Sequence, residues 1–98
     1  MVIASFANQG TEDIFHGEST KAARKTLQKT LWAVASRKLD YLNAAVALKD
    51  LQVPPGNKLE ALKGDLAGRH SIRINDQFRI VFRFDRGQAS EVEIVDYH

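Results

Sequence analysis

Apolar residues follow a helical spacing through the middle of the chain. They recur three and four positions apart in two sets of different phase: Leu27, Leu31 and Val34, then Leu39, Leu42 and Val46. No glycine or proline interrupts residues 20–46, and Ser19 or Thr20 can cap the start of the helix. This interval predicts one long helix or two shorter ones, with a bend or break near residues 36–38, where the phase slips.

The segment before this interval predicts a strand followed by a short helix. Residues 2–7 are largely apolar, which favours a first strand. We expect Thr11 to cap the helix, because Glu12 and Asp13 place negative charge in its first turn, beside unpaired backbone N–H groups. We expect the helix to end near Gly17.

The helical part of the chain ends at Pro54-Pro55-Gly56, and beyond it apolar residues alternate with polar ones. The alternation predicts strands at residues 59–62, 72–74, 78–84 and 92–95. Turns are predicted at Asn75-Asp76 and at Asp85-Arg86-Gly87. The pattern favours an α+β fold in one domain of residues 1–98: an antiparallel sheet whose apolar face is covered by the amino-terminal helices.

Composition narrows the class of protein. The 98 residues are 44% hydrophobic and 27% charged, which is typical of a small globular protein. The chain has no cysteine, which excludes disulfides, thiolate zinc ligands and a cysteine nucleophile. No apolar run approaches the ~20 residues of a membrane-spanning helix, and the apolar start is too short for a signal peptide. We therefore expect a cytoplasmic protein with no membrane partner.

Positive charge is concentrated in two parts of the chain, although the net charge is only +2. One set lies in the predicted helices: Lys21, Arg24, Lys25, Lys29, Arg37 and Lys38. The other set runs through the predicted sheet: Lys58, Lys63, Arg69, Arg73, Arg79, Arg83 and Arg86. Such asymmetry suggests a polyanionic or acidic partner, the alternative being ordinary solvated surfaces.

Arg73, Arg79 and Arg83 are expected on one face of two adjacent strands, because they share the parity of the alternation. Arginine forks fit phosphates, so several on one face suit an RNA backbone. Apart from the turn residue Asp76, we expect no acid at the partner positions, and like charges on neighbouring strands repel one another. An anion from outside the fold would offset this repulsion.

Asp96-Tyr97-His98, at the carboxyl end of the sequence, has two interpretations. Terminal residues often fray; alternatively, the last strand holds the three side chains beside the arginines. RNA cleavage without a metal needs a base for the 2′-OH proton, cations for the charged phosphorane and an acid for the 5′-oxygen. Histidine and tyrosine transfer protons, and arginine and lysine stabilise the charge, so the second interpretation predicts a cleavage site.

Four further residues have weaker claims to a role in chemistry. Glu60 is either a base or a solvated acid, and Lys63 either contacts phosphate or simply occupies a turn. His16 is explained by a helix end, and His70 is expected at the surface or as a peripheral nucleic-acid contact. Because the histidines are isolated and no metal-binding or phosphate-loop motif is present, we expect no metal and no cofactor.

Blocks spread over nearly the whole sequence resemble the HigB branch of the RelE toxin superfamily. These blocks occur in the expected order: TEDIFHGE at 11–18, PPGNKL at 54–59, LKGD at 62–65, SIRIN at 71–75, FRIVF at 78–82 and DYH at 96–98. The resemblance implies a microbial-RNase-like α+β fold. It also implies a ribosome-dependent, metal-independent mRNA endonuclease that inhibits translation and growth by 2′-OH transphosphorylation. The implied partner is a helix-turn-helix antitoxin of the HigA type, in a heterotetramer that also binds operator DNA.

The resemblance also assigns roles to individual residues. Positions linked to cleavage in the family match Lys63, Arg79, Asp96, Tyr97 and His98. The basic RNA-binding face comprises Arg73, Arg83, Lys58 and Arg69. An antitoxin or ribosome contact is expected on the first helices at Lys21, Arg24 and Lys25. Some members carry a histidine where this chain has Glu60, so the general base is left open between Glu60 and His98.

Two other functions are compatible with the same charges. A non-catalytic nucleic-acid-binding or regulatory module would bind RNA or DNA in a salt-sensitive way without cleavage. A toxin that attacks a protein target would arrest growth while leaving mRNA intact. The terminal Asp96-Tyr97-His98 favours the nuclease, because binding alone does not require proton-transfer groups.

Overall fold

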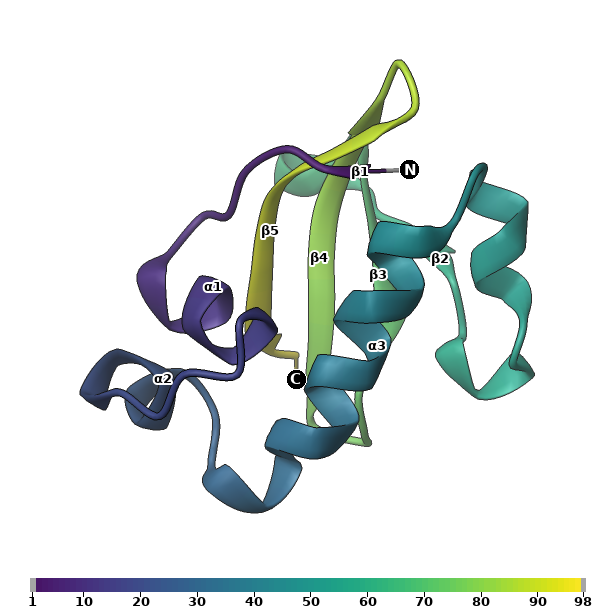
Figure 1. Cartoon of the computed structure of the whole chain (residues 1–98). Helices are drawn as coiled ribbons and strands as arrows, with labels where there is room; N and C mark the ends of the chain where they lie inside the picture. The colour runs from purple at the N-terminus through teal and green to yellow at the C-terminus, as the bar shows by residue number, and fades with distance from the viewer. Residues whose placement is uncertain (1, 98) are drawn as a thin grey trace.

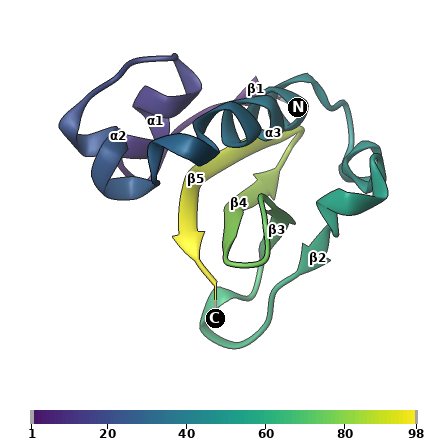
Figure 2. The same ribbon diagram turned by 90° about the horizontal axis from the view of Figure 1, so that it is seen from below.

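The alternating second half of the chain forms most of a single sheet. A computed structural model describes residues 2–97, and in this part of the chain five strands pair in the order β1-β5-β4-β3-β2. The strands are β1 (Val2–Ile3), β2 (Glu60–Ala61), β3 (Arg69–Arg73), β4 (Phe78–Asp85) and β5 (Gln88–Asp96). Three α-helices lie on one side of this sheet in the described residues: α1 (Gln9–Phe15), α2 (Lys21–Thr26) and α3 (Trp32–Ala44) (Figures 1 and 2). The predicted α+β fold with helices on one face is confirmed.

The two longest strands are joined as the sequence predicts. Only Arg86 and Gly87 connect β4 to β5, and both have positive φ, 51° and 76°. This pair of left-handed residues is the hairpin connection whose twist matches that of the flanking strands. Strands β2 to β5 are antiparallel, as expected, whereas β1 pairs with β5 in parallel. The expected first strand is shorter than residues 2–7, and Phe6 contributes only an isolated bridge to Val92.

The core lies between α3 and the apolar face of the sheet. Fully buried side chains from both layers meet there: Leu39 and Leu42 from α3, and Ile72, Ile80, Phe82 and Val92 from the strands. Since the side chains of a strand alternate, burying Ile80 and Phe82 turns Arg79 and Arg83 to the opposite face. Within residues 2–97, no helix has the length and apolar character required to cross a bilayer.

The cap of the first helix is Asn8, and the predicted Thr11 cap is wrong. Asn8 has extended backbone angles, and its side-chain oxygen accepts a hydrogen bond from Thr11 N at 2.8 Å. Thr11 is instead buried against the sheet, where its Oγ1 accepts a hydrogen bond from Ile94 N at 3.1 Å. A buried backbone N–H needs a hydrogen-bond acceptor, and Thr11 supplies one to Ile94 instead of capping the helix.

The long helical interval is divided near Leu27, and the predicted break at residues 36–38 is wrong. α2 begins after the cap Thr20 and ends at Thr26, and Leu27 has extended backbone angles (φ −155°, ψ 138°). The Leu27 carbonyl accepts a hydrogen bond from Trp32 Nε1 at 2.7 Å, and the Leu27 side chain is buried. α3 ends at Ala44, so Val46, the last residue of the predicted apolar set, lies beyond the helix and is 81% exposed.

Asp13 ties α1 to the start of α2 and makes stability depend on pH. Its carboxylate accepts hydrogen bonds from Thr20 Oγ1 at 2.6 Å and Gln9 Nε2 at 2.7 Å. The Thr20 bond first, then the Gln9 bond, lowers the pKa of Asp13 below its ordinary value. A lowered acid pKa stabilises the fold above that ordinary value, and the stabilisation disappears as the pH falls through the folded-state pKa.

We therefore expect Asp13→Asn to be less stable than the parent protein at neutral pH, by an amount that shrinks below about pH 4. Urea unfolding at a series of pH values measures this difference. Asp40→Asn, at an exposed position of α3, is the matched control and should show no such trend. A constant difference between Asp13→Asn and the parent at all pH values would contradict the linkage.

Candidate active site

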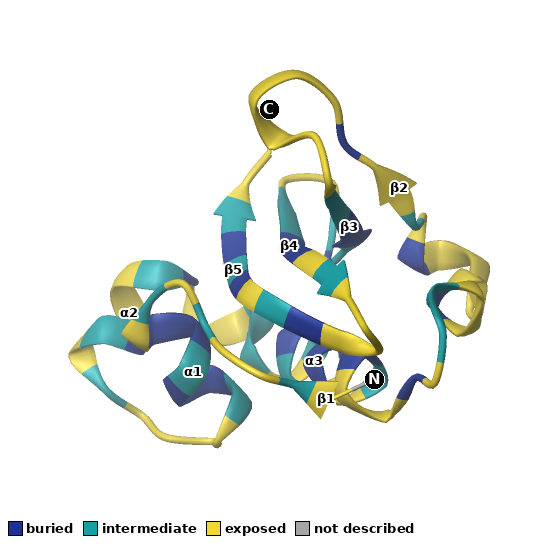
Figure 3. Ribbon diagram, turned by 90° about the horizontal axis from the view of Figure 1, so that it is seen from above, coloured by how far each residue is buried: buried dark blue, intermediate teal, exposed yellow. Residues whose placement is uncertain are grey.

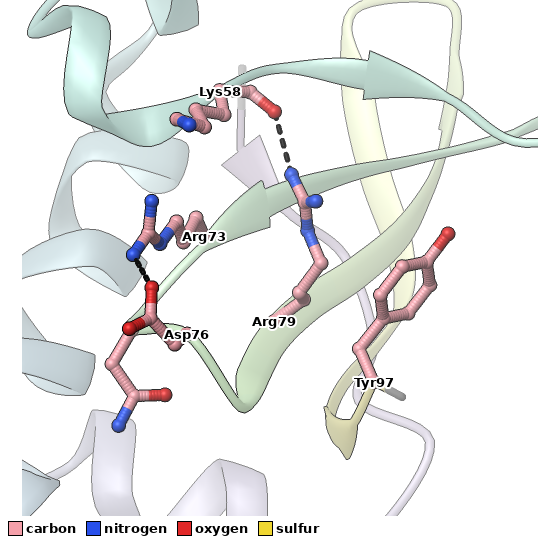
Figure 4. Close-up of a pocket in the computed structure, with 6 residues that line it drawn as sticks. Lys58, Arg73, Asp76, Arg79 and Tyr97 are labelled. Atoms are coloured by element: carbon pink, nitrogen blue, oxygen red, sulfur yellow. Dashed lines mark hydrogen bonds and ion pairs between the residues drawn. The ribbon is translucent and has the colours of Figure 1, made fainter.

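The arginines of β3 and β4 face one another across the exposed side of the sheet. The strand register places Arg73 opposite Arg79 and Arg69 opposite Arg83, so their predicted sharing of one face is confirmed. Arg73, Arg79, Lys58 and Tyr97 line a pocket of about 210 Å³ together with Asn75 and Asp76 (Figure 4). Residues from the turn before β2, the β3–β4 hairpin and the end of β5 therefore converge on one hollow.

Arg79 is held at the centre of this pocket. Its Nη2 donates a hydrogen bond to the Lys58 carbonyl at 2.6 Å, and its guanidinium carbon lies 5.3 Å from the centre of the Tyr97 ring (Figure 4). The Arg79 Nε is buried and has no hydrogen-bond partner among the described residues. No carboxylate of residues 2–97 forms an ion pair with Arg79. Its charge is therefore available to an anion, and stacking on the tyrosine ring fixes its direction.

Tyr97 is anchored to the neighbouring strand through its backbone. Its N donates a hydrogen bond to the Gln77 carbonyl at 2.7 Å, and Asp96 pairs with Phe78 in the sheet. Gln77 Nε2 also donates to Asp96 Oδ2 at 3.0 Å. For Asp96 and Tyr97, these contacts support the interpretation in which the last strand holds the side chains beside the arginines, and they argue against a frayed end. His98 lies outside the described residues.

A second hollow adjoins the first on the other side of Tyr97. It has a volume of about 480 Å³ and is lined by Glu60, Ala61, Leu62, Lys63 and Tyr97. Two of these lining residues are joined, because the Tyr97 hydroxyl donates to Glu60 Oε1 at 3.3 Å. Strand β2 carries Glu60 there, opposite Ser71 on β3. A potential base, a lysine and a tyrosine hydroxyl thus lie beside the Arg79 pocket.

Acids on the arginine face correct one expectation from the sequence. Arg73 pairs with Asp76 across the hairpin turn, and Arg83 Nε lies 2.5 Å from Glu91 Oε2. Arg69 lies 3.6 Å from the same Glu91 carboxylate. The expectation that this face lacks partner acids apart from Asp76 is wrong, because Glu91 pairs with Arg83 and Arg69. The alternation misses Glu91 because the register shifts beside it and its φ is positive (51°), which brings its side chain over β4.

The basic residues of α2 are not part of this site. Helix α2 lies on the helix side of the sheet (Figure 3), away from the arginine face, and its Lys21, Arg24 and Lys25 are exposed. The ring centroids of His70 and Phe82 are 6.1 Å apart, and the two rings are stacked on the core side of the sheet. His70 was expected at the surface and is instead half-buried. His16 lies at the end of α1, 3.9 Å from the carboxylate of Glu12. No group of three or more potential metal ligands is found within residues 2–97.

Three polar residues near the site were missed by the sequence analysis. Ser71 is fully buried on the floor of the arginine face, and its Oγ has no partner among the described residues. Lys38 and Asn57 are buried together, and Lys38 Nζ donates a hydrogen bond to Asn57 Oδ1. The helical spacing contained a signal for Lys38, which stands three residues after buried Ala35 and four before buried Leu42.

The fold is that of the RelE-like toxins. A YoeB-YefM complex from Staphylococcus aureus is similar over 100% of this chain and 99% of the solved chain, with a TM-score of 0.53 and 20% identity. A YoeB/ParE toxin from Agrobacterium tumefaciens is similar over the full length of both chains, with a TM-score of 0.54 and 18% identity. A heterotetrameric YoeB-YefM toxin-antitoxin complex from Staphylococcus aureus covers 100% of this chain and 99% of its own, with a TM-score of 0.54 and 20% identity. At these identities the likeness establishes the fold alone.

The chain belongs to the HigB-like toxin family, whose model, described as the RelE-like toxin of type II toxin-antitoxin system HigB, matches residues 4–98. Toxin HigB-1 of Vibrio cholerae is 51% identical over 53 residues, which cover 54% of this chain. An uncharacterized protein of Haemophilus influenzae is 32% identical over 66 residues, or 67% of this chain. The matches span 56% and 65% of the lengths of these two relatives. The predicted family resemblance is confirmed.

Proposed function

We propose that this toxin is a metal-independent endoribonuclease that cleaves mRNA on the ribosome and thereby inhibits translation and growth. The observation that carries the proposal is the array formed by Arg79, Tyr97 and Glu60 across two adjoining hollows. An anion-binding arginine beside a carboxylate and a tyrosine hydroxyl is the set of groups that phosphodiester cleavage requires.

The reaction that suits this array is attack by a ribose 2′-oxygen on the adjacent phosphorus. Glu60 takes the 2′-OH proton, the 2′-oxygen–phosphorus bond forms and the bond from phosphorus to the 5′-oxygen breaks. The products are a 2′,3′-cyclic phosphate and a 5′-hydroxyl, which receives its proton from an acid. For that role we propose Asp96 or His98, both at positions that the family resemblance links to cleavage. Arg79 and Lys63 stabilise the charge that develops on the phosphorane. Arg73, Arg83, Lys58 and Arg69 extend the phosphate-binding face, with Arg73 and Arg83 exchanging their acid partners for RNA.

The decisive experiment incubates the purified protein with a programmed ribosome and follows the mRNA by primer extension. Cleavage by the parent protein that persists with a chelator, and that is lost when Tyr97 and His98 are deleted, supports metal-independent cleavage at the proposed site. Reactions with mRNA alone test the dependence on the ribosome. Binding without cleavage would favour the non-catalytic alternative, and growth arrest with intact mRNA would favour a protein target.

The partner proposed for this toxin is a helix-turn-helix antitoxin of the HigA type, in a heterotetramer that binds operator DNA. The fold neighbours solved with the antitoxin YefM support an antitoxin partner. The exposed α2 surface of Lys21, Arg24 and Lys25 is the proposed contact for the antitoxin or the ribosome, because it leaves the arginine face free. Charge reversal at Arg24 and Lys25 that changed neither complex would contradict this contact. Because the proposed target is the ribosome, we also propose that the protein acts in the cytoplasm. We propose that residues 1–98 form one domain.

A further inference from the structure

Lys38 is a buried cation that lacks a carboxylate partner among the described residues. Its side chain stands on α3, is 8% exposed and makes no ion pair within residues 2–97. Its ammonium group lies 5.7 Å from the centre of the Tyr41 ring. Burial first, and then the nearby charges of Arg37 and Arg73, lowers the pKa of Lys38. Burial of an ammonium group is costly unless its hydrogen bonds are satisfied, so the contact that Lys38 does make is informative.

That contact is with Asn57, which organises the turn before β2. Asn57 is fully buried, and its Oδ1 accepts the hydrogen bond from Lys38 Nζ. Its Nδ2 donates to the Leu51 carbonyl at 3.1 Å and to the Val53 carbonyl at 3.3 Å. Its backbone N donates to the Pro54 carbonyl at 2.9 Å. The side chain of Asn57 therefore ties the short 3₁₀ turn at Pro55–Asn57 to the backbone of residues 51–53.

The turn that Asn57 holds delivers a backbone carbonyl to Arg79. Lys58 follows Asn57 directly and has left-handed backbone angles (φ 46°, ψ 56°), with its N bonded to the Pro55 carbonyl at 3.1 Å. Those angles are unfavourable for a side chain such as lysine and persist only where the surroundings fix them. In this conformation the Lys58 carbonyl accepts the 2.6 Å hydrogen bond from Arg79 Nη2 (Figure 4).

We propose that Lys38 is a positioning residue that acts through Asn57 and the Lys58 carbonyl to hold the Arg79 guanidinium in the pocket. The chain of contacts runs from the helix layer to the arginine face: Lys38 to Asn57, Asn57 to its turn, and Lys58 to Arg79. Its consequence for RNA cleavage rests on the proposed function, whereas its consequence for the order of Arg79 does not.

The first test follows Arg79 itself, without any reaction. Heteronuclear NMR of arginine Nε–H groups compares the parent protein with Lys38→Met, which keeps an unbranched stem and removes the charge. The buried Arg79 Nε–H signal is expected to exchange faster with water or to disappear in Lys38→Met. It should persist in Lys49→Met, at an exposed lysine, because the side-chain hydrogen bonds of Asn57 go to Lys38, Leu51 and Val53. If Lys38→Met does not fold, Lys38→Gln, with a shorter side chain that cannot hold Asn57 in the same place, is expected to show the same loss.

The second test is a double-mutant cycle in the cleavage assay. Lys38→Met is expected to lower kcat about tenfold with KM little changed, and to cause no further loss when Arg79 is already alanine. A purely structural role would reduce both backgrounds equally, and an unchanged Arg79 signal in folded Lys38→Met would overturn the proposal. If the parent protein does not cleave mRNA, the proposed function fails, and the NMR comparison still decides the role of Lys38.

Discussion

Replacing Arg79 with alanine is expected to reduce mRNA cleavage by about 100- to 1,000-fold, the loss typical of removing one preorganised donor to a developing negative charge. The side chain has no acid partner within residues 2–97, and it is held by the Lys58 carbonyl and the Tyr97 ring. It therefore meets the phosphorane without first breaking an ion pair. Single-turnover cleavage on saturating programmed ribosomes measures the effect on the chemical step.

Two further variants test whether the loss is specific to the Arg79 side chain: a control at another arginine and a conservative replacement of Arg79. Arg86→Ala removes an arginine from the β4–β5 turn, at the far end of β4 from Arg79, and should leave cleavage unchanged. Arg79→Lys keeps the charge but loses the fork that reaches the Lys58 carbonyl, so activity should be restored only in part. Equal activity of Arg79→Ala and Arg86→Ala would remove Arg79 from the mechanism, and circular dichroism spectra of all three variants would show whether the fold is retained.

The features that the sequence predicts well are those set by neighbouring residues. The alternation of residues 78–84 is decided by each side chain's own polarity, and the buried Ile80 and Phe82 follow from it. The hairpin turn at Arg86 and Gly87 is equally local, because its positive φ angles depend on the residues in the turn. The same alternation placed Arg79 on the correct face before any contact was known.

The features that the sequence misses depend on side-chain burial and side-chain hydrogen bonds that form only in the folded chain. Leu27 leaves the helix because its side chain is buried and its carbonyl is satisfied by Trp32, and neither gain is visible in helix propensity. Asn8 competes successfully with Thr11 for the cap because Thr11 is needed by Ile94, 83 residues away. Burial of Leu27 together with its bond from Trp32 therefore accounts for the misplaced break, and the long-range bond from Ile94 to Thr11 accounts for the misplaced cap.

The candidate site shows the same division. Alternation brings Arg73 and Arg79 together, but it does not reveal that Glu91 turns back over Arg83 at an irregularity in the strand. Nor does it reveal that Glu60, in a strand of two residues, reaches the hydroxyl of Tyr97. The arginine face was predictable from parity, whereas the pairing of its charges required the backbone.

Substitution of Tyr97 is also expected to cause a large loss of mRNA cleavage. The contacts of its ring and of its hydroxyl can be removed separately. Tyr97→Phe removes the hydrogen bond to Glu60 but keeps the ring beside Arg79. Tyr97→Ala removes both and opens the wall that the two hollows share. If the hydroxyl takes part in proton transfer, phenylalanine should already lower cleavage by about 100-fold or more, and alanine should add little.

The kcat values of these variants distinguish the two roles of Tyr97. If the hydroxyl orients the Glu60 carboxylate, Tyr97→Phe should lower kcat with KM little changed, because the contact to Glu60 is lost while the ring remains. Glu60→Gln should lower kcat at least as far, and Glu93→Gln, elsewhere on the polar face of β5, should leave it unchanged. If Tyr97→Phe is as active as the parent protein while Tyr97→Ala is not, the ring acts by holding Arg79, and proton transfer must be assigned to another group.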